Sequence, residues 1–145
     1  MILFDIDHFK RINDSWGHDQ GDTVLRQVAN SARTVMRGRD RIGRIGGEEF
    51  LVVLPGASVE QAAQAAERLR LAISQAIFKT EPAAGQAEVI VPVTISLGVS
   101  SQRDEDRAFD RIVARADAAL YRAKAEGRNR VVAEQLPTYS AAASV

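Results

Sequence analysis

The chain has 145 residues, of which 46% are hydrophobic and 26% are charged, and its formal net charge is zero. This composition indicates one folded domain, and a neutral chain is not typical of proteins that bind nucleic acid polymers or anionic membranes. The absence of cysteine excludes disulfides and thiolate metal sites, and no apolar run approaches the ~18–20 residues that span a bilayer.

The N-terminal third predicts one strand and two helices. Residues 1–4 are apolar and suit a buried strand, at whose end Asp5 falls. Acids at strand ends often serve as helix N-caps or solvated turn residues, so Asp5 alone assigns nothing. A short helix is expected at 8–16 and a longer one at 18–36, which Gly38 helps to stop. The longer helix has an apolar stripe at helical spacing, made by Val24, Leu25, Val28, Ala29, Ala32, Val35 and Met36.

Residues 40–54 predict a β-hairpin whose turn is Gly46-Gly47, because both glycines tolerate positive φ. Its strands are the apolar runs 42–45 and 50–54, and Pro55-Gly56 ends it. Glu48 and Glu49 follow the turn directly. Such acids can hold a hard cation such as Mg²⁺ against phosphate oxygens, although a hairpin with solvated acids explains the motif as well. If the first strand neighbours this hairpin, three or four carboxylates meet at one edge, and a divalent cation would neutralise them.

The remaining elements alternate between helices and strands. Ser58 suits the N-cap of a helix that reaches residue 77. Residues 78–87 are expected to form a loop, and 88–101 a strand region in which Pro92 suggests a bend or an edge. A last long helix at 109–123 has Gly127 as its C′ residue, and a strand follows at 130–133. Residues 136–145 are rich in Ala and Ser and are expected to fray. This order indicates a mixed sheet with helices on one face, and leaves a doubly wound α/β fold open.

Four segments together resemble the GGDEF family of diguanylate cyclases, in its GGEEF form. They are Asp5-Ile6-Asp7-His8-Phe9-Lys10, Gly46-Gly47-Glu48-Glu49-Phe50, Val93-Thr94-Ile95-Ser96-Leu97-Gly98-Val99 and Ala116-Asp117-Ala118-Ala119-Leu120-Tyr121-Arg122-Ala123-Lys124 with the turn after it. The resemblance runs from about Ile2 to Val132. It implies an α+β, ferredoxin-like palm fold with a mixed, mainly antiparallel central sheet and flanking helices, related to nucleotide cyclases and polymerase palms.

The resemblance also implies a domain at 1–133 and a flexible tail at 134–145. Family members usually carry an Asp-x-Leu-Thr-Gly-Leu-x-Asn-Arg stretch before the first strand. This chain begins inside that strand, without the lead-in helix. We therefore expect reduced stability and weak activity in this form. The resemblance places the domain in the bacterial cytoplasm, without direct membrane contact, whether or not the parent protein is membrane-anchored.

The reaction that the resemblance implies joins two GTP molecules into cyclic di-GMP and releases two pyrophosphates. Asp5, the carbonyl of Ile6 and Glu48 are the implied ligands of two Mg²⁺ or Mn²⁺ ions per half-site, since oxygen ligands suit both metals. Glu48 and Glu49 are the implied catalytic residues, with Glu49 a metal ligand or a proton acceptor. Because one domain holds one GTP, two domains must pair as a homodimer.

The resemblance assigns a further set of residues to the substrate. The N–H groups of His8 and Phe9, at a helix start, suit phosphate oxygens, and Gly46 and Gly47 lie under the nucleotide. The side chains implied to bind phosphate or guanine are Lys10, Asn13, His18, Asp22, Lys124 and Arg128. Simpler structural roles remain open for three groups: an N-cap for Asp22, packing for His18, and helix C-terminal cations favoured by the macrodipole for Lys124 and Arg128.

A second ligand site is implied by Arg37-Gly38-Arg39-Asp40. This Arg-x-x-Asp stands at the family's spacing before Gly46 for the product-inhibition site, with Arg68 as an accessory residue. An exposed ion pair is the alternative, and product can also compete at the GTP pocket. Two other functions remain open: a catalytically weak or silent module that binds GTP or cyclic di-GMP, and a cyclase that acts on a single purine nucleotide.

Overall fold

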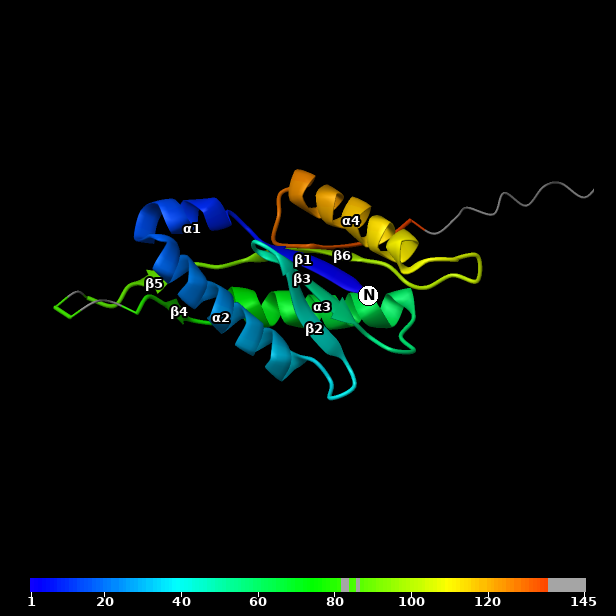
Figure 1. Cartoon of the computed structure of the whole chain (residues 1–145), viewed down its shortest axis with the longest axis horizontal. Helices are drawn as coiled ribbons and strands as arrows, with labels where there is room; N and C mark the ends of the chain where they lie inside the picture. Colours follow the sequence, from blue (N-terminus) through cyan, green and yellow to red (C-terminus); the bar gives the residue numbers. More distant parts are fainter. Residues whose placement is uncertain (82–83, 86, 136–145) are drawn as a thin grey trace, which may run out of the picture.

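A computed structural model describes residues 1–81, 84–85 and 87–135 of the chain. Figure 1 shows its helices and strands in sequence colours. The helices are α1 (Phe9–Trp16), α2 (His18–Val35), α3 (Val59–Gln75) and α4 (Phe109–Ala125). The strands are β1 (Ile2–Ile6), β2 (Arg41–Gly46), β3 (Glu49–Val53), β4 (Phe78–Lys79), β5 (Ile90–Val91), β6 (Ile95–Val99) and β7 (Val131–Ala133). Among the described residues, none of these helices combines the length and apolar character of a transmembrane span.

Five strands form the central sheet in the order β2-β3-β1-β6-β7, and a separate ribbon pairs β4 with β5. The β6–β7 pairing is parallel, and the other neighbours in the central sheet are antiparallel. This confirms the mixed, mainly antiparallel α+β fold. It excludes the doubly wound alternative, whose strands would be mostly parallel. The hairpin β2–β3 lies beside β1, so the two acidic segments are neighbours.

Helices cover both faces of the sheet, so the expectation of helices on one face was wrong. In Figure 1 α4 lies on one side of the sheet and α2 and α3 on the other. Side chains alternate along β1: Ile2, Phe4 and Ile6 join the larger core with α2 and α3, whereas Leu3 joins a smaller core with residues of α4. Because Asp5 follows the same alternation as Leu3, it lies on the side of α4.

Gly98 of β6 lets α4 approach the sheet closely. A Cβ on this residue would stand 2.0 Å from the carbonyl oxygen of Ala116 and 2.4 Å from the backbone nitrogen of Leu120. Both atoms belong to the backbone of α4, which a side-chain rotation cannot move. The glycine therefore sets the distance between the sheet and the helix that carries Lys124.

Several element boundaries differ from the sequence prediction. Strand β1 extends to Ile6, so Asp5 lies within the strand and not beyond its end. The hairpin turn is Gly47-Glu48 and not Gly46-Gly47, because a register shift between Arg44 and Gly46 lets Gly46 pair with Glu49. Of the two glycines, Gly47 has positive φ, at 23°. The bulge moves the turn by one residue and leaves Glu48 at the tip.

The loop predicted at 78–87 begins instead with β4, because Phe78 is buried in the larger core and pairs with Val91. The strand region predicted at 88–101 is divided into β5 and β6. Pro92 lies between them, where the strand region is interrupted.

The predicted helix ends are partly confirmed. Ser58 caps α3 in a capping box, since its Oγ accepts from the N–H of Gln61 and its N–H donates to Gln61 Oε1. Gly127 has φ 115° just after the end of α4, as expected of a C′ glycine. Gly38 does not stop α2, because the helix ends at Val35 and Met36 already has extended backbone.

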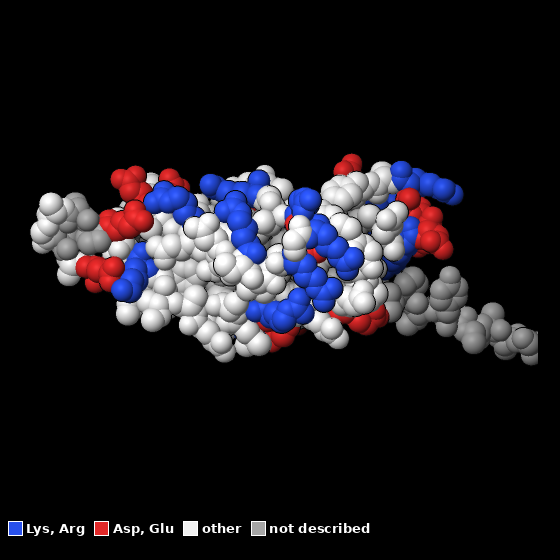
Figure 2. All heavy atoms as spheres, turned by 90° about the horizontal axis from the view of Figure 1, so that it is seen from below, with Lys and Arg blue, Asp and Glu red and all other residues white. Residues whose placement is uncertain are grey.

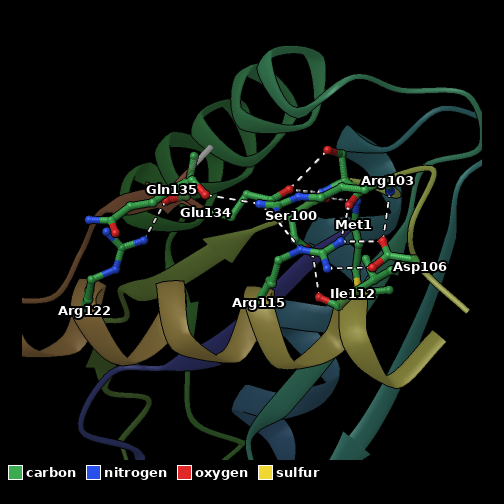
Figure 3. Close-up of polar contacts among 11 residues, drawn as sticks. Met1, Ser100, Arg103, Asp106, Ile112, Arg115, Arg122, Glu134 and Gln135 are labelled. Atoms are coloured by element: carbon green, nitrogen blue, oxygen red, sulfur yellow. Dashed lines mark hydrogen bonds and ion pairs between the residues drawn. The ribbon is translucent and has the colours of Figure 1, made fainter. Parts of the chain in front are cut away.

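The end of the folded domain lies beyond the predicted boundary at residue 133. Glu134 is 7% exposed, and its carboxylate accepts from the N–H of Ser101 and from Arg103 at 2.6 Å each. Arg115 of α4 lies 2.6 Å from both Glu134 and Asp106. Figure 3 shows these side chains together with Arg103. This ion network ties the segment after β7 to α4, so Glu134 belongs to the domain and not to the expected tail. The rest of that tail, 136–145, lies outside the described residues.

Candidate nucleotide and metal site

The pairing of β1 with β3 brings the two predicted acidic segments together. Asp5 and Glu49 are directly opposed in the antiparallel register, and the N–H of Ile6 donates to the carbonyl oxygen of Glu48 at 3.3 Å. Directly opposed residues place their side chains on the same face of a sheet. Asp5 and Glu49 therefore lie at one end of the sheet on the side of α4, and Glu48 stands beside them at the hairpin tip.

Asp5 is 8% exposed, and its Oδ2 accepts from the Lys124 ammonium at 2.9 Å. Burial raises the pKa of the Asp5 carboxyl to about 6, against the bond from Lys124, which lowers it. The charges of Glu48 and Glu49 raise this pKa further. A carboxylate in this position gains from any additional cation, because burial and two like charges oppose its ionised form.

The three carboxylates do not form a ready-made metal cage. In the described part of the chain, no group of three or more His, Asp or Glu residues is arranged to hold a metal ion. The expected neutralisation of the cluster is carried out here in part by Lys124. The donor set still suits Mg²⁺, which is usually bound by one or two carboxylates together with substrate phosphates and water. Asp5 and Glu48, with the Ile6 carbonyl, match that pattern.

The hairpin tip leaves open space above its glycines. An added Cβ on Gly47 would meet nothing within 4 Å, and one on Gly46 would meet Glu49 Oε2 at 4.0 Å. The glycines are therefore not required by packing inside the domain. Open backbone beside two carboxylates suits the approach of a large ligand.

The predicted phosphate-binding segment lies directly after β1. His8 has left-handed φ at 55° and caps α1, and Phe9 is the first residue of the helix. Phe9 is buried while the side chains of His8 and Lys10 are exposed. The backbone N–H groups of His8 and Phe9 stand at a helix N-terminus two and three residues after Ile6, where the macrodipole favours an anion.

The predicted guanine-binding residues lie on α1 and α2. Asn13 Oδ1 is enclosed and has no hydrogen-bond partner among the described residues. It occupies space that Gly21 leaves free, since a Cβ there would be 1.8 Å away. Asp22 lines a cavity of about 380 Å³ between α2 and β2, and His18 is exposed at the start of α2. Asn13 is not among the residues that line this cavity, so the structure places the two predicted guanine-binding residues near each other, with Asn13 against Gly21 beside Asp22, but not in one cavity.

The Arg-x-x-Asp motif forms a second hollow. Arg37, Asp40 and Arg68 line one pocket of about 120 Å³, although Arg68 comes from α3, far along the chain. The carboxylate of Asp40 accepts from the N–H of Arg37 at 2.9 Å, and the N–H of Asp40 donates to the carbonyl of Arg37 at 2.9 Å. This local turn holds both side chains beside Arg68.

Charge is distributed unevenly although the net charge is zero. Figure 2 shows Lys and Arg side chains gathered over the middle of the face seen from below. Arginines line both hollows: Arg26, Arg33 and Arg44 in the larger one, and Arg37, Arg39 and Arg68 in the smaller one. Neutral composition thus conceals surfaces that suit phosphate-bearing ligands.

Lys124 and Arg128 mark the end of α4 and the turn after it. Lys124 is held by Asp5, whereas Arg128 is exposed and has left-handed φ at 62°. Sequence reasoning gave no role to Asp7, which is buried and accepts three hydrogen bonds. Its spacing of two residues from Asp5, directly after β1, was the available signal. No sequence motif marks the ion network of Arg103, Asp106, Arg115 and Glu134.

Comparison with known proteins agrees with this geometry. The family model described as "Diguanylate cyclase, GGDEF domain" matches residues 1–130. The response regulator PleD of Caulobacter vibrioides is 42% identical over 131 residues, which cover 90% of this chain and 28% of that protein. Diguanylate cyclase DgcP of Pseudomonas aeruginosa is 44% identical over 133 residues, 90% of this chain and 18% of that protein. The chain thus spans less than a third of these two relatives.

Solved structures show the same fold. The active GGEEF domain of a diguanylate cyclase from Vibrio cholerae superposes with a TM-score of 0.81 at 38% identity, over 93% of this chain and 81% of that one. The GGDEF domain of DgcB from Caulobacter crescentus, in complex with c-di-GMP, gives 0.82 at 36% identity, over 91% and 75%. With its fold, its paired acidic segments and a family match over most of its length, this chain belongs to the GGDEF family of diguanylate cyclase domains.

Proposed function

We propose that this domain is a diguanylate cyclase that condenses two GTP molecules into cyclic di-GMP and releases two pyrophosphates. The observation that carries the proposal is the register of β1 against β3, which opposes Asp5 to Glu49 beside the open Gly46-Gly47 tip. Degenerate hairpins would lack the acids or the glycines, and this chain keeps both. That favours an active enzyme over a silent nucleotide-binding module.

Each residue of the site has a proposed role. The N–H groups of His8 and Phe9, with Lys10, bind phosphate oxygens, and Lys124 and Arg128 bind the terminal phosphates. Asn13 and Asp22 read the guanine, and His18 shapes that pocket. Two Mg²⁺ or Mn²⁺ ions per half-site, held by Asp5, the Ile6 carbonyl and Glu48, would neutralise triphosphate charge and activate the attacking 3′-hydroxyl. Glu49 assists as a further ligand or as the proton acceptor.

Binding of substrate would rearrange the contact between Lys124 and Asp5. The Lys124 ammonium lies 2.9 Å from Asp5 Oδ2. With the triphosphate in place, its phosphates offer Lys124 a second anion, and Asp5 is released to face a cation. The exchange keeps the buried Asp5 charge compensated throughout, and most of the rate enhancement comes from positioning and charge neutralisation.

Two further features complete the proposal. The reaction needs two domains related by two-fold symmetry, because each 3′-hydroxyl attacks the α-phosphate of the other nucleotide. Cyclic di-GMP is proposed to bind the pocket of Arg37, Asp40 and Arg68 as an inhibitor, since arginine binds phosphate bidentately and aspartate reads a guanine edge. We also propose a cytoplasmic site of action.

The test is incubation with GTP and Mg²⁺, followed by chromatography of the products. Cyclic di-GMP supports the proposal, a cyclic mononucleotide supports the single-nucleotide cyclase, and unconverted GTP supports the silent module. Glu48→Ala is expected to lower turnover by at least about two orders of magnitude, as for loss of a preorganised electrostatic contact. Near-normal turnover in that variant would refute the metal role of Glu48.

A further inference from the structure

The carboxylate of Asp7 is buried in the turn directly after β1, outside the roles proposed so far. The residue is 6% exposed. Its Oδ1 accepts from Ser96 Oγ at 2.6 Å, and its Oδ2 accepts from Thr94 Oγ1 at 2.7 Å and from the N–H of Asn129 at 3.0 Å. Burying a carboxylate is costly unless its lone pairs are used. Asp7 thus joins three segments: the turn between β1 and α1, the start of β6, and the turn after α4.

The turn that Asp7 holds has unusual backbone geometry. Gly127, Arg128 and Asn129 have φ values of 115°, 62° and 43° in succession. Left-handed φ is ordinary for glycine and tolerated by asparagine, but it costs an arginine free energy that the surroundings must supply. The N–H of Arg128 donates to the carbonyl of Ala123 at 3.0 Å, and the next N–H donates to Asp7. The conformation of Arg128 is therefore held from both sides.

We propose that Asp7 is a positioning residue that aims Arg128 at the terminal phosphates of the nucleotide. The inference rests on the proposed function, because it is that function which places phosphates beside Arg128. Asp7 itself does not touch the substrate. It lies two residues after Asp5, in the turn that follows β1, so one short segment carries both the acid paired with Lys124 and the carboxylate that holds the turn of Arg128.

The chemistry explains why a carboxylate stands here. Three donors converge on two oxygens, and both oxygens must accept. In Asp7→Asn the amide oxygen can still accept from Asn129, while the amide NH₂ can face the Ser96 hydroxyl, which then accepts. In Asp7→Ala the N–H of Asn129 loses its acceptor altogether. Asp7→Asn thus removes the charge and keeps the hydrogen bond to Asn129, whereas Asp7→Ala removes both.

The experiment measures the Kd of the full chain for a non-hydrolysable GTP analogue with Mg²⁺ by calorimetry. Asp7→Ala is expected to weaken binding about tenfold, the usual scale for a lost buried hydrogen bond, and Asp7→Asn by less than about threefold. Arg128→Ala is expected to weaken binding about as much as Asp7→Ala. The double variant combines Asp7→Ala with Arg128→Ala. If Asp7 acts through Arg128, the two losses overlap, and the Kd of the double variant is at most about twofold above that of the single variant that binds less tightly.

Glu134→Ala is the matched control. Glu134 is also a buried carboxylate, 7% exposed, that accepts from a backbone N–H and fixes α4, but it does not contact the turn. It is expected to lower thermal stability and to leave the Kd within about twofold of wild type, as is usual for a distant, independent site. If Asp7→Ala does not fold, Asp7→Ser replaces it in the single and double variants, because the serine side chain is too short to reach Asn129.

The proposal is overturned if Asp7→Ala binds like wild type, if the losses of the two single variants multiply, or if Glu134→Ala weakens binding as much as Asp7→Ala. A wild-type chain that does not bind the analogue overturns it together with the proposed function. A wild-type chain that binds the analogue but forms no cyclic di-GMP from GTP refutes the cyclase function alone. The Kd values of the single and double variants then still test the role of Asp7.

Discussion

Replacement of Gly98 by alanine tests whether close packing of α4 on β6 positions the site. The new Cβ would lie 2.0 Å from the Ala116 carbonyl oxygen, whereas real Cβ contacts essentially never fall under 3.0 Å. Helix α4 must therefore move by about 1 Å or more, because the obstructing atoms are backbone. Overpacking of this kind costs about 3 kcal/mol, a large fraction of the roughly 5–15 kcal/mol that stabilises a domain.

The assay is thermal unfolding of Gly98→Ala, followed by circular dichroism. A loss of about 3 kcal/mol corresponds to a fall in Tm of about 10 °C for a chain of this size. Nucleotide affinity should fall too, since the same movement displaces Lys124, whose ammonium lies 2.9 Å from Asp5. Gly38→Ala is the control, because a Cβ there meets nothing within 4 Å and its φ is not positive.

A Gly98→Ala variant that unfolds within about 2 °C of wild type would refute the reasoning, given that an unstrained surface substitution changes stability by only about 0.5 kcal/mol. It would mean that α4 can retreat from the sheet at little cost. The position of Lys124 relative to Asp5 would then not depend on close packing.

Two other outcomes follow from the structure. Arg37→Ala removes one wall of the pocket shared with Asp40, so it is expected to weaken inhibition by cyclic di-GMP and to preserve turnover. The measurement is a set of progress curves with added product, and unchanged inhibition would reject that pocket. The hydrogen bond from Arg115 holds the pKa of the Asp106 carboxyl well below its usual range. The pair therefore stabilises the fold fully above about pH 4, and this stabilisation is lost as the pH falls and Asp106 is protonated. Asp106→Asn should therefore be less stable than wild type in urea at pH 7 and lose less stability on acidification, whereas parallel pH profiles would contradict the assignment.

Much of the fold could be predicted because local patterns and the tertiary structure agree. The apolar stripe of α2, the capping box at Ser58 and the C′ glycine at residue 127 are signals that a few neighbouring residues produce. The two acidic segments were recognisable for the same reason, since each is contiguous in the chain. The roles assigned to individual side chains stay predictions until nucleotide binding is measured.

The errors of prediction concern features that depend on which strands pair and in which register, and not on the local run of residues. The hairpin turn moved by one residue because of a bulge that the pairing of β2 with β3 creates, and Phe78 became a strand residue because it pairs with Val91. The close approach of α4 to β6 at Gly98 also gave no signal in the sequence, because only the backbone of α4 above this residue excludes a side chain there.

The amino-acid order alone was sufficient to identify the acidic hairpin, the glycine tip and the Arg-x-x-Asp motif, because each is a short run with its own chemistry. Folding was needed to oppose Asp5 to Glu49, to pair Asp5 with Lys124, and to bring Arg68 beside Arg37. It was also needed to reveal Asp7 as the acceptor that holds Asn129. These contacts join residues up to 122 positions apart, and hydrogen bonds and charge act over a few ångströms in space, whatever the separation along the chain.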